Sequence, residues 1–323
     1  MSRTASAMLA ALALGAGCTS TPADTAADAG APSSSTAEPA EPARPFEFET
    51  ITQAFVDTSR PHTDGMGNEL APERTLETVI RIPVGGGPRP VILFSHGLGG
   101  HPSGFTELLD AWAAAGYLVA APTFPLSNGE SPDYYENSFL GVRDQPADIS
   151  FVLDQLIGLS EDEASPLAGR VDETRVGAGG LSLGGGTTLA LGYNDCCRDE
   201  RLDALEILSG FPFDVSGEYH YDAGPPTLVV HGDADASLPY ATAQATYDQM
   251  GSDKWLVTLI GGSHSPPYED ADSPWDDVVI AVTIDFWDAE LLPPDGKRPD
   301  HDALAKLEAD ATADAQLTSF AAG

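Results

Sequence analysis

Apolar and polar positions alternate in short blocks over residues 46–292, and the period of each block predicts an element. Residues 51–56 and 76–84 switch between apolar and polar at about every second position. This predicts two half-buried strands that open the domain as an antiparallel pair. Later runs are apolar throughout, which is typical of strands covered on both faces. These runs are residues 91–95, 117–122, 176–180, 205–208, 227–230 and 255–260.

Helical spacing appears between these strands. In residues 148–159, for example, the apolar positions 149, 152, 153 and 156 fall on one face of a helix. The segments predicted as helices are residues 105–115, 148–159, the stretch that follows residue 182, 241–250 and 274–291. Alternation of strands and helices predicts an α/β domain with a mostly parallel, doubly wound sheet flanked by helices. We place this domain at residues 46–292, followed by a polar tail over 293–323 with one solvated helix and a frayed end.

The N-terminal residues predict export. Residues 7–17 are apolar but too short to remain as a membrane-spanning helix, and they end at Cys18. Residues 1–18 resemble a bacterial lipoprotein signal, with Leu14-Gly-Ala-Gly-Cys18 in the place of the lipobox, although Gly15 stands where a large aliphatic residue is usual. The resemblance implies lipid attachment at Cys18, with plain secretion as the alternative. Residues 19–45 lack large apolar side chains almost entirely, which predicts a disordered linker.

Charge restricts the possible partners. The formal net charge is -35, and lysine occurs only at positions 254, 297 and 306. Such a surface repels nucleic acid and anionic membranes, so we expect membrane contact only through a lipid anchor at Cys18. It also favours solubility, and we expect a monomer.

The pentapeptide Gly180-Leu-Ser182-Leu-Gly184 lies between an apolar strand and a helix of small residues. A serine on such a turn is held in a strained conformation with its hydroxyl exposed above the sheet, which makes Ser182 a candidate nucleophile. Taken alone, the motif is also compatible with a glycine-rich turn that carries an incidental serine.

A serine nucleophile needs a histidine base and an acid that orients it, and on this kind of turn the partners follow in the order serine, acid, histidine. The histidines after Ser182 are His220, His231, His264 and His301. We favour His264, because it follows the last predicted core strand, and we expect a structural role for His231. The loop after residues 227–230 offers Asp233 and Asp235 as the acid.

Acyl transfer also needs donors for the developing oxyanion. One candidate is the backbone N–H of Leu183, directly after the serine. The second is the N–H of Leu98 in Ser95-His-Gly-Leu-Gly-Gly100, which follows an early strand. We expect His96 to hold this loop rather than to transfer protons.

The segments H-G-x-G-G, G-x-S-x-G and D…G-S-H together resemble the α/β-hydrolase superfamily across residues 46–292. Within it, the chain is similar to secreted bacterial polyester hydrolases (cutinase-like) and to esterases like platelet-activating-factor acetylhydrolase and dienelactone hydrolase. Dienelactone hydrolases proper use cysteine as the nucleophile, whereas this chain has Ser182. The polyester hydrolases carry D-x-x-x-P, which fits residues 235–239 and favours Asp235 over Asp233 as the acid.

The resemblance also indicates residues that border the substrate. Pro212-Phe213-Asp214 is similar to a P-W-D segment whose aromatic ring flanks the cleft, and here that ring is Phe213. Residues 125–146 are longer than the corresponding connection in polyester hydrolases. We interpret them either as a cap, with Tyr134, Tyr135 and Phe139 facing the acyl or alcohol group, or as a surface loop.

The resulting hypothesis is a carboxylic-ester hydrolase with the triad Ser182, His264 and Asp235. It would act on a small-molecule or polymeric ester without a cofactor or metal. The alternatives are a peptidase or amidase with the same triad, and a non-catalytic surface-binding domain on a hydrolase scaffold. For the adjacent residues Cys196 and Cys197, a structural role fits better than metal binding, because further ligands are lacking nearby.

Overall fold

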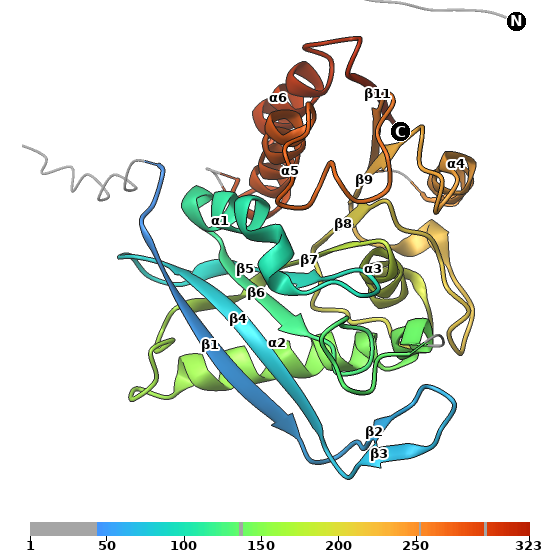
Figure 1. Ribbon diagram of the computed structural model, residues 1–323. Coiled ribbons are helices and arrows are strands. Elements are labelled where there is room, and N and C mark those ends of the chain that lie inside the picture. The colour runs from blue at the N-terminus through green and yellow to red at the C-terminus, as the bar shows by residue number, and fades with distance from the viewer. Residues whose placement is uncertain (1–43, 136–137, 252, 294–295) are drawn as a thin grey trace, which may run out of the picture. The chain divides into compact units, whose positions relative to one another are not determined.

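The computed structural model describes residues 44–135, 138–251, 253–293 and 296–323 (Figure 1). The expected signal segment, its Cys18 and nearly all of the expected linker lie outside these residues. The last linker position, Arg44, is described, and its guanidinium pairs with Asp288 at 2.6 Å. All described residues belong to one folded unit.

The sheet has nine strands in the order β1-β4-β6-β5-β7-β8-β9-β10-β11. From β6 to β10 in this order, neighbouring strands are parallel. The antiparallel strands β4 and β1 extend one side, and antiparallel β11 extends the other. The strands are β1 Phe48–Asp57, β4 Arg74–Pro83, β5 Arg89–Ser95, β6 Leu118–Thr123, β7 Val171–Leu181, β8 Ala204–Leu208, β9 Thr227–Gly232, β10 Lys254–Leu259 and β11 Thr318–Ala322. A separate hairpin pairs β2 His62–Thr63 with β3 Glu69–Ala71.

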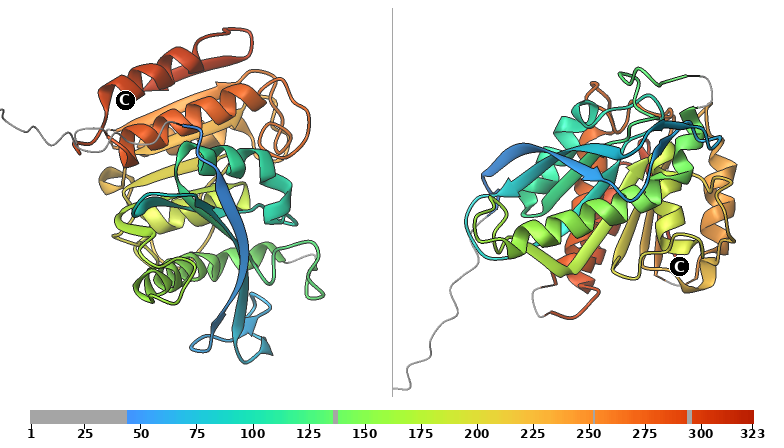
Figure 2. Two further views of the ribbon diagram at one scale, coloured as in Figure 1. Left: turned by 90° about the vertical axis from the view of Figure 1, so that its left-hand side faces the viewer. Right: turned by 90° about the horizontal axis from the view of Figure 1, so that it is seen from below.

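Helices cover both faces of this sheet (Figures 1 and 2). One face packs against α1 Thr106–Ala115, α5 Asp276–Leu291 and α6 His301–Ala311. The other packs against α2 Gln145–Glu161, α3 Leu183–Tyr193 and α4 Tyr240–Gln249. Short 3₁₀ helices lie at η1 Pro102–Phe105, η2 Ser138–Arg143 and η3 Tyr221–Ala223. Successive residues of a strand contribute to opposite cores, as the pleat requires, so that Leu93 and Phe94 of β5 lie in different apolar clusters.

The structure confirms the α/β-hydrolase fold class expected from the sequence, with its mostly parallel sheet flanked by helices. The C-terminal region differs from the expected solvated helix and frayed end. In α6, Leu307 and Ala311 are fully buried against the α5 layer. Strand β11 pairs with β10 from Trp255↔Ala322 to Leu259↔Thr318. These residues are therefore part of the folded unit. By pairing with β10, β11 covers a strand that would otherwise expose its N–H and C=O groups at the edge of the sheet.

The strand order reverses between β5 and β7, and in open α/β sheets this position is where a binding site forms. β5 connects through α1 to β6 on one side, while its other neighbour, β7, connects through α3 to β8 on the opposite side. Loops that leave the carboxyl ends of β5 and β7 therefore diverge, which opens a crevice where ligands bind in open α/β sheets. In β5 and β7 those loops carry residues 96–100 and Ser182.

A buried carboxyl group also lies in the sheet. Glu206 of β8 is 0 % exposed, and among the described residues its carboxyl group interacts with the indole N–H of Trp287 without a hydrogen bond of good geometry. Its side chain faces the layer of α5, where Trp287 presents its indole. Burial raises the pKa of Glu206 well above its ordinary value, so the folded protein holds this group as the neutral acid.

We expect the substitution Glu206→Gln to stabilise the protein increasingly as the pH rises. Above about pH 4.5 the unfolded chain ionises Glu206 while the folded protein keeps the proton, so unfolding releases a proton and stability falls by about 1.4 kcal/mol per pH unit. Glutamine has a similar shape and cannot ionise. Urea unfolding of both proteins at about pH 5, 6 and 7 measures the difference. If the free energy of unfolding changes with pH by the same amount in both proteins, Glu206 is not held as a buried neutral acid.

Candidate active site

Ser182 lies on a sharp turn between β7 and α3. Its backbone angles are φ 57° and ψ -113°, a conformation that non-glycine residues rarely adopt. A Cβ on Gly184 would lie 1.9 Å from the carbonyl oxygen of Ser95, and one on Gly180 would lie 2.6 Å from the backbone of Gly184. The glycines on both sides of the serine are therefore needed because the turn passes so close to β5.

Two loops from neighbouring strands bring a histidine and an acid to this serine. His264 follows β10, and its Nε2 lies 2.8 Å from Ser182 Oγ. Asp235 follows β9, and its Oδ2 lies 2.6 Å from His264 Nδ1. β9 and β10 are parallel neighbours, so both loops leave the same edge of the sheet. The three side chains form one continuous hydrogen-bonded chain.

Asp235 is held as a carboxylate. Its side chain is 0 % exposed, and its Oδ1 accepts the backbone N–H groups of Ser237 and Leu238, each at 2.8 Å. Burial opposes the charged form, but the donors from Leu238, His264 and Ser237 outweigh it and keep the pKa of Asp235 below its ordinary value. This environment supplies a fixed negative charge behind the imidazole of His264.

Asp233 has a different place in the same loop. Its Oδ1 accepts the backbone N–H of Gly261 at 2.6 Å, and the N–H of Ala234 donates to Gly262 O at 3.1 Å. A Cβ on Gly232 would lie 2.2 Å from that same Gly262 oxygen. Asp233 thus joins the loop after β9 to the loop that carries the histidine, whereas Asp235 contacts the imidazole itself.

The loop after β5 packs directly on the serine. A Cβ on Gly97 would lie 3.3 Å from Ser182 Cβ. Among the described residues, the backbone N–H groups of Leu98 and Leu183 have no acceptor, whereas the following Gly99 N–H donates to Ser127 O at 2.7 Å. Both free N–H groups belong to segments that border Ser182, which makes them candidate donors to an oxyanion.

His96 fixes this loop. It is fully buried, its Nδ1 lies 2.8 Å from Gly97 O, and its Nε2 accepts the N–H of Phe124 at 3.1 Å. Burial lowers the pKa of His96 to about 4, against the opposing effect of the Gly97 carbonyl. Both ring nitrogens are therefore occupied in a neutral imidazole, consistent with a role in holding the loop.

Residues 125–146 lie against the loop after β5. A Cβ on Gly129 would lie 2.8 Å from Gly99 O, and Tyr134 places its hydroxyl over Gly99. The buried Gln145 connects the segment to the helix of the serine, because its amide contacts both Ser127 and Thr187. Residues 136 and 137 lie outside the described part of the chain.

The aromatic residues expected around the substrate have unequal positions. Tyr134 and Phe139 are each 40 % exposed. Tyr135 turns its hydroxyl toward Asp64 O in the turn between β2 and β3. Phe213 packs against Phe211 with the rings tilted by 44° and 4.2 Å between their centroids, and it lies against the position of a Cβ on Gly186 in α3. The ring of Phe213 thus lies beside the helix that begins at the serine.

The other candidate residues are not in this constellation. His301 begins α6, and the half-exposed His220 faces Asp195. Cys196 and Cys197 are joined by a disulfide in the loop after α3. His231, for which the sequence indicated only a structural role, lies fully buried 3.2 Å from Asp235 Oδ2. Its position four residues before the acid does not by itself show that both side chains point to the same atom.

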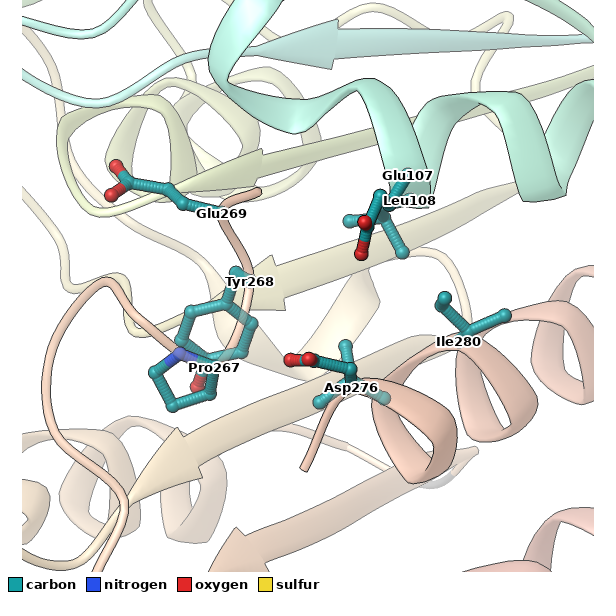
Figure 3. A pocket seen from close by; sticks show the side chains of 8 residues that line it. Glu107, Leu108, Pro267, Tyr268, Glu269, Asp276 and Ile280 are labelled. Atoms are coloured by element: carbon teal, nitrogen blue, oxygen red, sulfur yellow. The ribbon is translucent and has the colours of Figure 1, made fainter. Parts of the chain in front are cut away.

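An acidic pocket adjoins the histidine loop (Figure 3). Glu107 of α1, Glu269 of the loop and Asp276 of α5 line it together with Leu108, Pro267, Tyr268, Val279 and Ile280. Within residues 44–135, 138–251, 253–293 and 296–323, no cluster of three or more potential ligands could hold a metal ion. In the same ranges, no helix has the length and apolar character needed to cross a membrane.

The mostly parallel sheet with helices on both faces, and the serine on its strand-to-helix turn, define an α/β-hydrolase. Residues 142–288 match the family model described as "PETase: PET hydrolase-like". This is a family of serine carboxylic-ester hydrolases, and the chain is an enzyme of that class. A search of curated proteins finds no match.

Proposed function

We propose that the chain hydrolyses carboxylic esters through an acyl-enzyme intermediate formed on Ser182. The observation that carries this proposal is the continuous chain from Ser182 Oγ to His264 at 2.8 Å and from His264 to Asp235 at 2.6 Å. A serine hydroxyl is a weak nucleophile at neutral pH, and a base within hydrogen-bond reach removes that limit.

In the first half of the reaction, Ser182 Oγ attacks the carbonyl carbon while His264 Nε2 takes the hydroxyl proton. The negative charge that develops on the carbonyl oxygen is held by the N–H groups of Leu98 and Leu183. Asp235 stabilises the imidazolium and keeps Nδ1–H of His264 directed toward itself. The ester bond then breaks, and His264 returns the proton to the leaving alcohol.

In the second half, a water molecule takes the place of the alcohol. His264 removes one proton from this water, the resulting hydroxide attacks the acyl carbon, and Ser182 leaves with the proton from the imidazolium. The products are the carboxylic acid and the free enzyme. Neither half needs a cofactor, because the protons move only among Ser182, His264, substrate and water.

The family match supports polyesters or related esters as the substrate class. We propose that Tyr134, Phe139 and Phe213 border the acyl or alcohol group, since the first lies over the loop of Leu98 and the last beside α3. Residues 125–135 and 138–146 then form one wall of the cleft. Tyr135 supports that wall through its hydroxyl rather than by facing the substrate.

We further propose that the enzyme is exported and anchored by a lipid at Cys18. This rests on the N-terminal sequence and on its resemblance to lipoprotein signals. Metabolic labelling with a fatty-acid analogue, compared between the natural chain and Cys18→Ala, tests the anchor. Equal labelling of both chains would contradict it.

Labelling and turnover together test the proposed reaction. A fluorophosphonate should modify the enzyme once, and peptide mass mapping should locate the adduct on Ser182. The same preparation should release p-nitrophenol from a series of p-nitrophenyl esters and acid from a soluble polyester oligomer. Folded protein that shows neither an adduct nor turnover would contradict the proposal.

A further inference from the structure

The acid of the proposed triad faces two imidazoles rather than one. Oδ2 of Asp235 lies 2.6 Å from His264 Nδ1 and 3.2 Å from His231 Nε2. The side chains of His231 and Asp235 are both 0 % exposed, so this contact lies in the protein interior. His231 Nε2 also lies 2.9 Å from Leu238 O, in the turn that donates its backbone N–H groups to Asp235 Oδ1.

The surroundings of His231 define its protonation. Both neighbours of Nε2 are acceptors, so Nε2 carries the hydrogen, and Nδ1 has no hydrogen-bond partner among the described residues. A second proton on Nδ1 would be buried without an acceptor, which is costly. Burial lowers the pKa of His231, against the opposing effects of Leu238 and Asp235. The ring is therefore a neutral donor with one N–H directed between Leu238 O and Asp235 Oδ2.

We propose that His231 is a positioning residue of the triad, which fixes Asp235 and weakens the hold of Asp235 on the proton of His264. The inference rests on the proposed function. The N–H of His231 shares the oxygen that His264 uses, so less negative charge is available to stabilise the imidazolium of His264.

Other ionisable groups near His264 do not reproduce this effect. Asp233 anchors Gly261 with its carboxylate, and Glu269 lies on the same loop as His264. Glu269 has a raised pKa because burial disfavours its charge; the nearby His264 opposes this rise and the neighbouring Asp270 adds to it. Tyr268 is buried, donates to Val230 O and accepts from Ser209, and burial raises its pKa. Of these groups, His231 is the one that places a ring nitrogen 3.2 Å from the carboxylate oxygen bound by His264.

The test compares His231→Leu with His231→Gln. Leucine removes the N–H, and we expect the acid limb of the kcat/KM profile to move to higher pH by about half a unit to one unit. Glutamine can present an amide N–H toward the same two acceptors and should restore most of the original midpoint. A loss of packing alone would change the stability of both variants. It would not move the midpoint of the acid limb in His231→Leu and restore it in His231→Gln.

Two further measurements make the outcome unambiguous. If His231→Leu does not fold, as judged by thermal melting, His231→Asn replaces it, because the asparagine amide is too short to reach Asp235. The Cε1–H signal of His264, assigned by its loss in His264→Ala, gives the titration midpoint by NMR without turnover. Absence of esterase activity in the natural chain would refute the proposed function and leave this titration interpretable. Equal midpoints in the natural chain and in the variants that lack the N–H would overturn the role of His231.

Discussion

Replacement of Ser182 by alanine is expected to lower kcat for p-nitrophenyl ester hydrolysis by about 10⁴- to 10⁶-fold and to abolish labelling by a fluorophosphonate. Alanine removes the only atom that the proposed mechanism uses for attack, while the N–H groups of Leu98 and Leu183 remain in place. The residual rate should come from binding and from those donors alone.

The fold should tolerate this change. The Ser182 side chain makes one hydrogen bond, to His264, and alanine meets the same backbone strain at φ 57° as serine does. Thermal melting should therefore be nearly unchanged. Ser216→Ala, at an exposed serine outside the proposed triad, is the matched control and should keep full turnover. Turnover of Ser182→Ala within about tenfold of the natural enzyme would remove Ser182 from the mechanism.

The second large effect is expected from Asp235→Asn, which should lower kcat by about 10³- to 10⁴-fold. Asparagine keeps the shape and can accept the N–H groups of Ser237 and Leu238. Its neutral amide no longer stabilises the imidazolium, and it allows the tautomer of His264 with the proton on Nε2. That tautomer donates to Ser182 instead of accepting its proton, so the base is lost without loss of the fold.

Asp233→Asn is the matched control, two positions away in the same loop. Its Oδ1 bonds to the backbone of Gly261, and an asparagine oxygen can accept the same N–H. We expect a decrease in kcat of no more than about tenfold, from a less firmly held histidine loop. A loss in Asp233→Asn equal to that in Asp235→Asn would mean that the charge of the whole loop, rather than the carboxylate on His264, drives catalysis.

Local pattern was enough for the central elements of the fold. The helix expected at 148–159 is α2, which runs from Gln145 to Glu161, and the strand expected at 227–230 is β9, which runs to Gly232. These predictions succeed because burial on one or both faces of an element is written into the spacing of its own side chains. The short hairpin of β2 and β3 was missed, because its strands of two and three residues carry too few positions to show a period.

The sequence also placed the serine turn and favoured His264, because glycine spacing and strand order are local or sequential properties. Residue chemistry alone left Asp233 and Asp235 as alternatives, because both are carboxylates in the same loop. Only the position of the loop that carries His264 distinguishes them. The sequence contained no sign that residues 318–322 form an edge strand or that His231 points to the acid. Strand β11 pairs with β10, Asp233 binds Gly261, and His231 contacts Asp235 Oδ2. These partners meet only after the sheet has formed, and such long-range contacts leave no periodic pattern along the chain.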